Sequence, residues 1–164
     1  MANLSGNPWN FTSADAATAT AITAIVRNGQ GSALITATAH GLSVGQNISL
    51  QGNTPTGWNR GYQVVGVPTA NTFLVPITPD QSLLGNGSAF GSVYTAAYMQ
   101  LIEVTQMLWD GPTATNTMLL TDLTGRTLWN PTAVTGGSYT YMKAFPVFGL
   151  VINSLPSGTL QISV

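Results

Sequence analysis

Short segments of alternating hydrophobic and polar residues follow one another along most of the chain, separated by residues that favour turns. Alternation over about four to eight residues is typical of a β-strand with one buried face, because successive side chains point to opposite faces of a sheet. Segments 33–39, 46–51 and 159–164 alternate in this way. We therefore expect strands at these three places.

Turn residues are expected to join such strands into hairpins. Arg27–Gly31 follows a strand expected at 20–27, and its Asn-Gly sequence is a strong hairpin signal. Near the end of the sequence, Pro156–Gly158 separates two apolar segments and predicts another hairpin. Five short strands are expected within residues 20–78, and together they describe a small meander or barrel.

Residues 93–109 fit either a helix with one apolar face or a strand with two. We favour the strand, because two apolar faces suit a position in the middle of a sandwich, and Asp110 with the following Gly-Pro ends it. Glu103 lies within this apolar stretch. It must therefore face solvent or find a partner such as Lys143 or Arg126.

The loops divide the chain into four parts. Residues 1–19 form a polar N-terminal arm, residues 20–78 the small β module, and residues 79–92 a linker rich in Gly, Ser and Pro. Residues 93–164 are expected to form a β-sandwich domain, which an N-terminal strand could complete. The predicted fold class is all-β: an antiparallel β-sandwich with a small inserted or N-terminal β-barrel or meander module.

Composition agrees with this fold class and excludes several functions. Only 5% of the 164 residues are charged, whereas 44% are hydrophobic, and the polar share is mostly Thr, Ser, Asn, Gln and Gly. With four Lys and Arg residues in all, the chain can neutralise few phosphates, so we expect neither nucleic-acid binding nor polybasic binding to membranes. No apolar run approaches the ~18 residues that a transmembrane helix needs.

The chain has no Cys and one His, which removes zinc sites, iron–sulfur clusters, disulfides and thiol chemistry. We therefore expect no metal and no cofactor. Titratable groups are few and dispersed, whereas acid–base catalysis needs groups that converge. We therefore predict no catalytic residues and no enzymatic activity.

Gly41–Gly45 matches the G-x-S-x-G pattern of the α/β-hydrolase nucleophile elbow. That elbow requires a following helix and a His later in the chain, whereas the single His40 precedes Ser43. We interpret the pentapeptide as a β-turn. Asp110 and Asp122 both precede turn residues and are interpreted as turn caps, although a catalytic carboxylate pair or a calcium site completed by carbonyls stays open.

Trp58 lies close to Arg60 and Tyr62 in a polar loop rich in Gly, Pro and Asn. An exposed Trp in such a loop could contact a partner or stack on a sugar. The alternative is an aromatic side chain folded over the open end of a small barrel. We take these three residues as candidate interaction residues.

The other tryptophans divide into two groups. Trp9, with Phe11, belongs to the N-terminal arm, where both side chains either pack on their own domain or reach a neighbouring subunit. We count these two as candidate interaction residues as well. Trp109 and Trp129 sit beside strand patterns, so we expect them in core or inter-sheet packing.

Residues 33–76 contain a series of short motifs in a defined order. An HGL-x-VG turn at His40–Gly45 is followed by a strand, by a loop with an aromatic residue and a Gly at Trp58–Gly61, by V-x-x-V-P at Val64–Pro68, and by a strand at Ala70–Phe73. This order resembles a small β module that is common in structural proteins of tailed bacteriophages. The resemblance covers about a quarter of the chain.

A second stretch, within residues 105–164, is similar to β-sandwich domains of phage virions. The similarity lies in D-x-x-G-x-x-L-W at Asp122–Trp129, in Tyr139, and in the segment Gly149–Val164. The resemblance transfers no catalytic residues. It implies a structural role in a virion, often as a capsid decoration (cement) protein or as a tail component.

These resemblances lead to an expected function and to alternatives. We expect a virion protein on the capsid surface that stabilises the major capsid lattice, with the major capsid protein or other virion subunits as partners. A homo-oligomer, for instance a trimer, fits that role. The alternatives are a tail, baseplate or fibre-associated protein, and a carbohydrate-binding or adhesin module that uses Trp58 and Tyr62.

Overall fold

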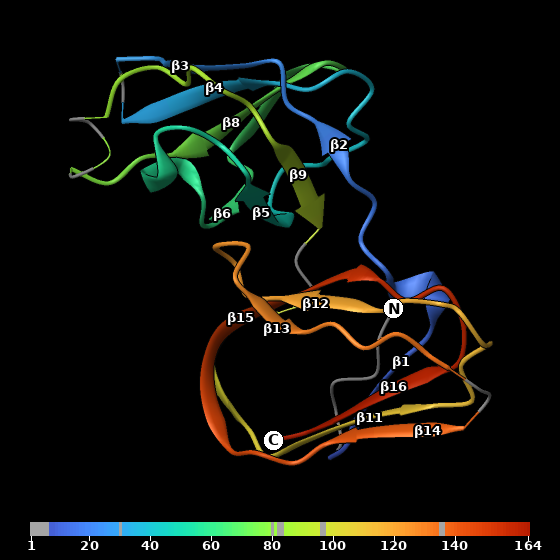
Figure 1. The fold of residues 1–164 in the computed structure, drawn as a ribbon. Coiled ribbons are helices and arrows are strands. Elements are labelled where there is room, and N and C mark those ends of the chain that lie inside the picture. Colours follow the sequence, from blue (N-terminus) through green and yellow to red (C-terminus); the bar gives the residue numbers. More distant parts are fainter. Residues whose placement is uncertain (1–6, 30, 80, 82–83, 96–97, 135–136) are drawn as a thin grey trace. The chain divides into compact units, whose positions relative to one another are not determined.

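The computed structural model describes residues 7–29, 31–79, 81, 84–95, 98–134 and 137–164. That part of the chain contains sixteen β-strands, and its helical structure consists of short 3-10 turns such as Thr56–Trp58. The strands form four antiparallel sheets of four strands each (Figure 1). The all-β prediction is confirmed.

The chain divides into two compact units. Unit 1 holds the described residues of Met1–Ala17, Ala97–Asp122 and Arg126–Val164. Unit 2 holds those of Thr18–Ala96 and Leu123–Gly125. Each unit contains two of the sheets and a hydrophobic core of its own.

Unit 2 is built from eight short strands whose buried residues form one core. One sheet has the order β2 (Thr20–Ala21), β9 (Ser92–Thr95), β5 (Asn47–Gln51), β6 (Gly61–Gln63). The other has the order β3 (Ala24–Arg27), β4 (Ser32–Thr36), β8 (Thr72–Pro76), β7 (Gly66–Thr69). The hairpin expected after residue 27 is confirmed: β3 pairs with β4, and the N–H of Asn28 donates to the carbonyl oxygen of Ser32 (2.9 Å).

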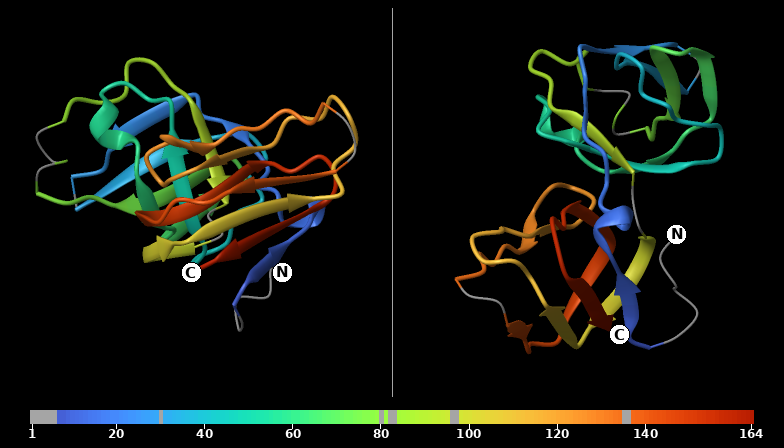
Figure 2. Two further views of the ribbon diagram at one scale, coloured as in Figure 1. Left: turned by 60° about the horizontal axis from the view of Figure 1, so that its bottom comes forward. Right: turned by 90° about the vertical axis from the view of Figure 1, so that its right-hand side faces the viewer.

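Unit 1 is also built from two four-stranded sheets that share one core (Figure 2). One sheet has the order β1 (Trp9–Phe11), β16 (Thr159–Ser163), β11 (Gln106–Asp110), β14 (Ser138–Tyr141). The other has the order β10 (Tyr98–Val104), β15 (Phe145–Ser154), β12 (Leu119–Thr121), β13 (Thr127–Trp129). Several connections between consecutive strands cross from one sheet to the other, as between β10 and β11.

Two strand predictions near the C-terminal half are wrong. The segments around Pro156–Gly158 do not form a hairpin, because β15 pairs with β10 and β12 whereas β16 pairs with β1 and β11. Residues 93–109 are not one strand either, because they contribute to β9, β10 and β11 in three different sheets. In both cases strands form in the segment, but alternation along a segment specifies neither where one strand ends nor which strand lies beside it.

The segment 79–92, expected as a linker, differs from that expectation wherever the structure describes it. Thr54 exchanges backbone hydrogen bonds with this segment, donating to the carbonyl oxygen of Ala89 (2.8 Å) and accepting from Ser88 N–H (2.9 Å). Gly87 N–H donates to the carbonyl oxygen of Ile25 (3.1 Å). Its polar composition therefore reflects a loop hydrogen-bonded to unit 2, and β9, which begins at Ser92, belongs to the same unit.

The N-terminal arm contributes a strand to unit 1. β1 pairs antiparallel with β16, with Trp9 opposite Ile162 and Phe11 opposite Leu160. Asn7 adds a side-chain link to the same strand end: its amide donates to the carbonyl oxygen of Val164 (2.7 Å). Within the described part of this segment, Trp9–Phe11 is thus an edge strand of a sheet, and a 3-10 turn at Ser13–Asp15 follows it.

Candidate functional site

Two large apolar side chains are exposed side by side on the outer face of a unit 1 sheet. Leu101 of β10 and Phe148 of β15 are opposite each other in the antiparallel register. Their exposed fractions are 67% and 61%, whereas the neighbouring Ile102 and Val147 are buried in the core. Strand alternation explains the difference: when Ile102 and Val147 point inward, Leu101 and Phe148 must point outward.

The next outward-facing pair in the same register consists of Glu103 and Pro146, both exposed. We call the four residues Leu101, Glu103, Pro146 and Phe148 the β10–β15 surface. It has one charged group, and its other three side chains are apolar. Because its exposed apolar side chains are adjacent rather than scattered, we take this surface as the candidate binding site.

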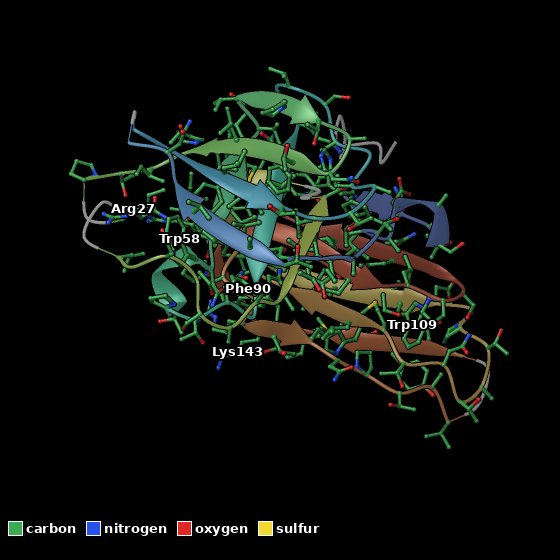
Figure 3. The ribbon with its side chains drawn as sticks, turned by 90° about the horizontal axis from the view of Figure 1, so that it is seen from above. Arg27, Trp58, Phe90, Trp109 and Lys143 are labelled. Atoms are coloured by element: carbon green, nitrogen blue, oxygen red, sulfur yellow. The ribbon has the colours of Figure 1, made fainter. Side chains whose placement is uncertain are left out.

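The candidate residues Trp58 and Tyr62 are not on an exposed surface. Both are buried in the core of unit 2, and Figure 3 shows the position of Trp58. The Trp58 indole N–H donates to the carbonyl oxygen of Gly85 (3.2 Å), and the Tyr62 hydroxyl donates to the carbonyl oxygen of Trp58 (3.2 Å). Arg60 is half-buried and donates to the Thr78 hydroxyl (3.3 Å). The exposed interpretation of Trp58 and Tyr62 is wrong, because both side chains are buried; of the two alternatives, an aromatic side chain folded into its own unit agrees with the structure.

Trp9 and Phe11 are likewise buried, in the core of unit 1. The pairing of β1 with β16 directs both side chains inward, and the ring of Trp9 lies 4.8 Å from that of Tyr98. Of the two interpretations of the arm, packing on its own domain is confirmed. These two side chains cannot also reach a neighbouring subunit.

The hydrolase-like pentapeptide is a turn without catalytic partners. It lies between β4 and β5 and is not followed by a helix. His40 is buried, with its Nδ1 accepting the backbone N–H of Leu42 (3.0 Å) and its ring lying edge-on to Phe73 at 5.1 Å. Ser43 is exposed, and its N–H donates to the side-chain oxygen of Gln46 (3.0 Å). The turn interpretation is confirmed.

The two aspartates discussed above are engaged in local structure. One Asp122 oxygen accepts the backbone N–H of Arg126 and the other accepts its Nε–H, both at 3.0 Å, which closes the turn between β12 and β13. The Asp110 carboxylate accepts a hydrogen bond from the Ser138 hydroxyl on the neighbouring strand β14. Among the described residues, no group of three or more His, Asp or Glu could hold a metal ion.

Two surface depressions are lined by described residues of unit 2. One, of about 520 Å³, is lined by Arg27, Ile77, Thr78 and neighbouring glycine and proline residues. The other, of about 270 Å³, is lined by hydroxyl and amide side chains and by apolar side chains in similar numbers, together with His40 and Tyr94. In the second depression the Nε2 atom of His40 has no hydrogen-bond partner among the described residues, so none of these hydroxyl groups is held against it.

The β10–β15 surface was not anticipated from the sequence. The available signal was the two-faced apolar pattern of residues 93–109, which also fits a strand buried on both faces.

No described helix has the length and apolarity needed to cross a membrane. No protein-family model, curated protein or solved structure matches the chain.

Proposed function

We propose that this chain is a non-enzymatic structural protein of a tailed-bacteriophage virion, acting as a capsid decoration protein that binds neighbouring subunits through the β10–β15 surface. The observation that carries the proposal is the exposed cross-strand pair of Leu101 and Phe148. The resemblance of residues 33–76 and of Asp122–Trp129 to phage virion proteins supplies the biological setting. A tail position is the alternative within the same setting.

The chemistry of the surface suits many weak, repeated contacts. Burying one Leu or Phe side chain contributes about 1.5–3 kcal/mol, so each copy would bind modestly by this pair alone. A symmetric lattice offers the same contact many times, and linked contacts reinforce one another. With 5% charged residues in the chain, binding should depend little on salt.

The carbohydrate-binding alternative loses its support. Sugar stacking needs an accessible aromatic face, whereas Trp58 and Tyr62 are buried and hydrogen-bonded within unit 2. The choice between capsid and tail depends on copy number: hundreds of copies in a virion density map would identify a decoration protein, and a few dozen or fewer would identify a tail part. Particles that lack the chain should also fail at a lower temperature if it stabilises the lattice.

Replacing Phe148 with Asp should weaken binding of the chain to virion particles that lack it by at least tenfold. The change removes apolar area and places a carboxylate where burial would leave it unpaired. Because Phe148 is 61% exposed, the free energy of unfolding should hardly change. Cosedimentation of purified chain with the particles measures the binding.

A matched control is Val44→Asp, since Val44 is 64% exposed and belongs to unit 2. It introduces the same charge at a comparably exposed apolar position that is not one of the four residues of the β10–β15 surface. Binding by the Val44 variant should equal that of the wild type. Equal binding by the Phe148 variant would exclude this surface as the attachment site.

A further inference from the structure

Strand β10 is an edge strand that lacks the usual protection against pairing. Among the described strands it pairs with β15 alone, and it is seven residues long. The other edge strands of the four sheets have two to four residues, which is itself a protection, and β7 also contains Pro68. β10 has no Pro and no Lys, and Glu103 is its one charged residue.

Pro146 determines which backbone groups of β10 point away from β15. Hydrogen-bonded and non-hydrogen-bonded pairs alternate along an antiparallel ladder, and a proline has no N–H to donate. Because Pro146 is opposite Glu103, that pair must be non-hydrogen-bonded, and Ile102 with Val147 must be the hydrogen-bonded pair. The N–H and C=O groups of Leu101 and Glu103 therefore point toward the open edge.

Thr105 supports this assignment independently. It lies two residues beyond Glu103, so its backbone groups should point to the same side, away from β15. Its N–H donates to the carbonyl oxygen of Ser163 at the end of β16 (2.9 Å). The backbone groups that point away from β15 thus form hydrogen bonds where another strand is close enough. The backbone N–H and C=O groups of Leu101 and Glu103 point to the same side and are available for such bonds.

We propose that two copies of this chain pair through β10, antiparallel and with the two-fold axis at Ile102. In this register Leu101 is opposite the partner's Glu103, and Glu103 is opposite the partner's Leu101. All four residues direct their backbone groups at the facing strand, so reciprocal hydrogen bonds form. The two β10–β15 sheets become one continuous sheet, and their exposed Leu101 and Phe148 side chains lie on the same face.

Charge and register favour this axis over the neighbouring ones for a pair of identical strands. A two-fold axis at Glu103 would place two carboxylates directly opposite each other, which destabilises a sheet. An axis at Ile102 instead places each carboxylate opposite a leucine. A pairing axis at Leu101 is less suitable, because it would bring the irregular register between Tyr98 and Leu101 into the new ladder. This inference does not depend on the proposed virion function.

The test uses two opposite charges at one exposed position. Leu101→Glu places a carboxylate opposite the partner's Glu103, on both sides of the axis, and should raise the dimer dissociation constant at least tenfold over the wild type. Leu101→Lys places an ammonium group there instead and should bind at least tenfold more tightly than Leu101→Glu. Sedimentation velocity of the full chain over a concentration series measures all three dissociation constants.

Adding Glu103→Lys to Leu101→Glu exchanges the charges across the axis and should restore dimerisation to the level of Leu101→Lys. Circular dichroism and the unfolding midpoint of each variant verify that the fold is retained, as expected at a position that is 67% exposed. A wild-type chain that stays monomeric at all concentrations would overturn the inference. Equal dissociation constants for Leu101→Glu and Leu101→Lys would overturn it too. Neither result would bear on particle binding through Phe148.

Discussion

Replacing Trp109 with alanine is expected to lower the free energy of unfolding of unit 1 by about 3–5 kcal/mol. The Trp109 side chain is fully buried in the core of unit 1, on strand β11 between β16 and β14 (Figure 3). Truncation removes its whole contact area and leaves a cavity that a sheet held on both sides can fill only in part. Chemical denaturation followed by amide hydrogen exchange would measure the loss and assign it to unit 1.

The indole also holds a turn in place. Its N–H donates to the carbonyl oxygen of Ser157 (2.8 Å), and the Ser157 hydroxyl accepts from Thr113 N–H and from the Asn116 amide, both at 2.8 Å. Trp109→Phe would retain much of the buried area but remove this donor. We expect it to cost about 0.5–1.5 kcal/mol, the net contribution of one hydrogen bond, because Ser157 is half-buried and its carbonyl is not sealed from water.

Trp129→Ala is the matched control for the size of the deleted side chain. Trp129 is half-buried on the edge strand β13, where its ring lies 6.3 Å from that of Tyr141. Its truncation leaves a site open to solvent, so the loss should be clearly smaller than for Trp109. Losses of the same size at the two positions would contradict a core role for Trp109.

Local patterns predicted the strands of this protein better than their partners. The Asn-Gly turn after Arg27 joins two strands that pair, because a short turn of that type positions its own flanking strands. The sequence around Pro156–Gly158 has equally clear strands on either side, yet they belong to different sheets. Alternation reports which residues face a core, and both arrangements satisfy it equally well.

The candidate aromatic residues show that local sequence patterns also predict the burial of side chains incompletely. The polar sequence neighbours of Trp58 left two positions open, one exposed in a loop and one folded over the end of a small barrel. The burial of this side chain depends on the carbonyl of Gly85 and on core residues from several strands, none of which a local window contains. Trp109, by contrast, lies within an alternating apolar segment, and its expected core position is confirmed. Local hydrophobicity therefore predicts burial for a residue within an alternating strand, and not for a residue in a polar loop.

The low charge of the chain has a structural consequence at the edge strand β10. Proteins commonly protect long edge strands with charged residues, and a chain with 5% charged residues has few to place there. Leu101 and Phe148 are exposed on the sheet whose edge strand β10 has Glu103 as its one charged residue. The low charge from which we expect neither nucleic-acid binding nor a metal site also suits binding by sheet edges and apolar faces.

Replacing Gly91 with alanine should destabilise unit 2 by about 1–3 kcal/mol or more, the range observed when atoms are inserted into closely packed structure. A Cβ atom at this position would lie 1.9 Å from the carbonyl oxygen of Gln51 and 2.7 Å from the carbonyl carbon of Gly52. Both are backbone atoms, so no side-chain rotation relieves the overlap. The strands β9 and β5 must separate, and the hydrogen bond from Ile22 N–H to the Gly91 carbonyl oxygen (2.9 Å) is disturbed as well.

Gly85→Ala supplies the control within the same segment of unit 2. A Cβ atom there has no heavy atom within 4 Å, and the substitution leaves the carbonyl that accepts from Trp58 unchanged. Its effect on the free energy of unfolding should stay within about 0.5 kcal/mol of zero. Increased hydrogen exchange in β5 and β9 for the Gly91 variant alone would establish that this segment is packed against unit 2. Equal stability of the two variants would mean that residues 84–92 behave as the flexible linker that their composition indicates.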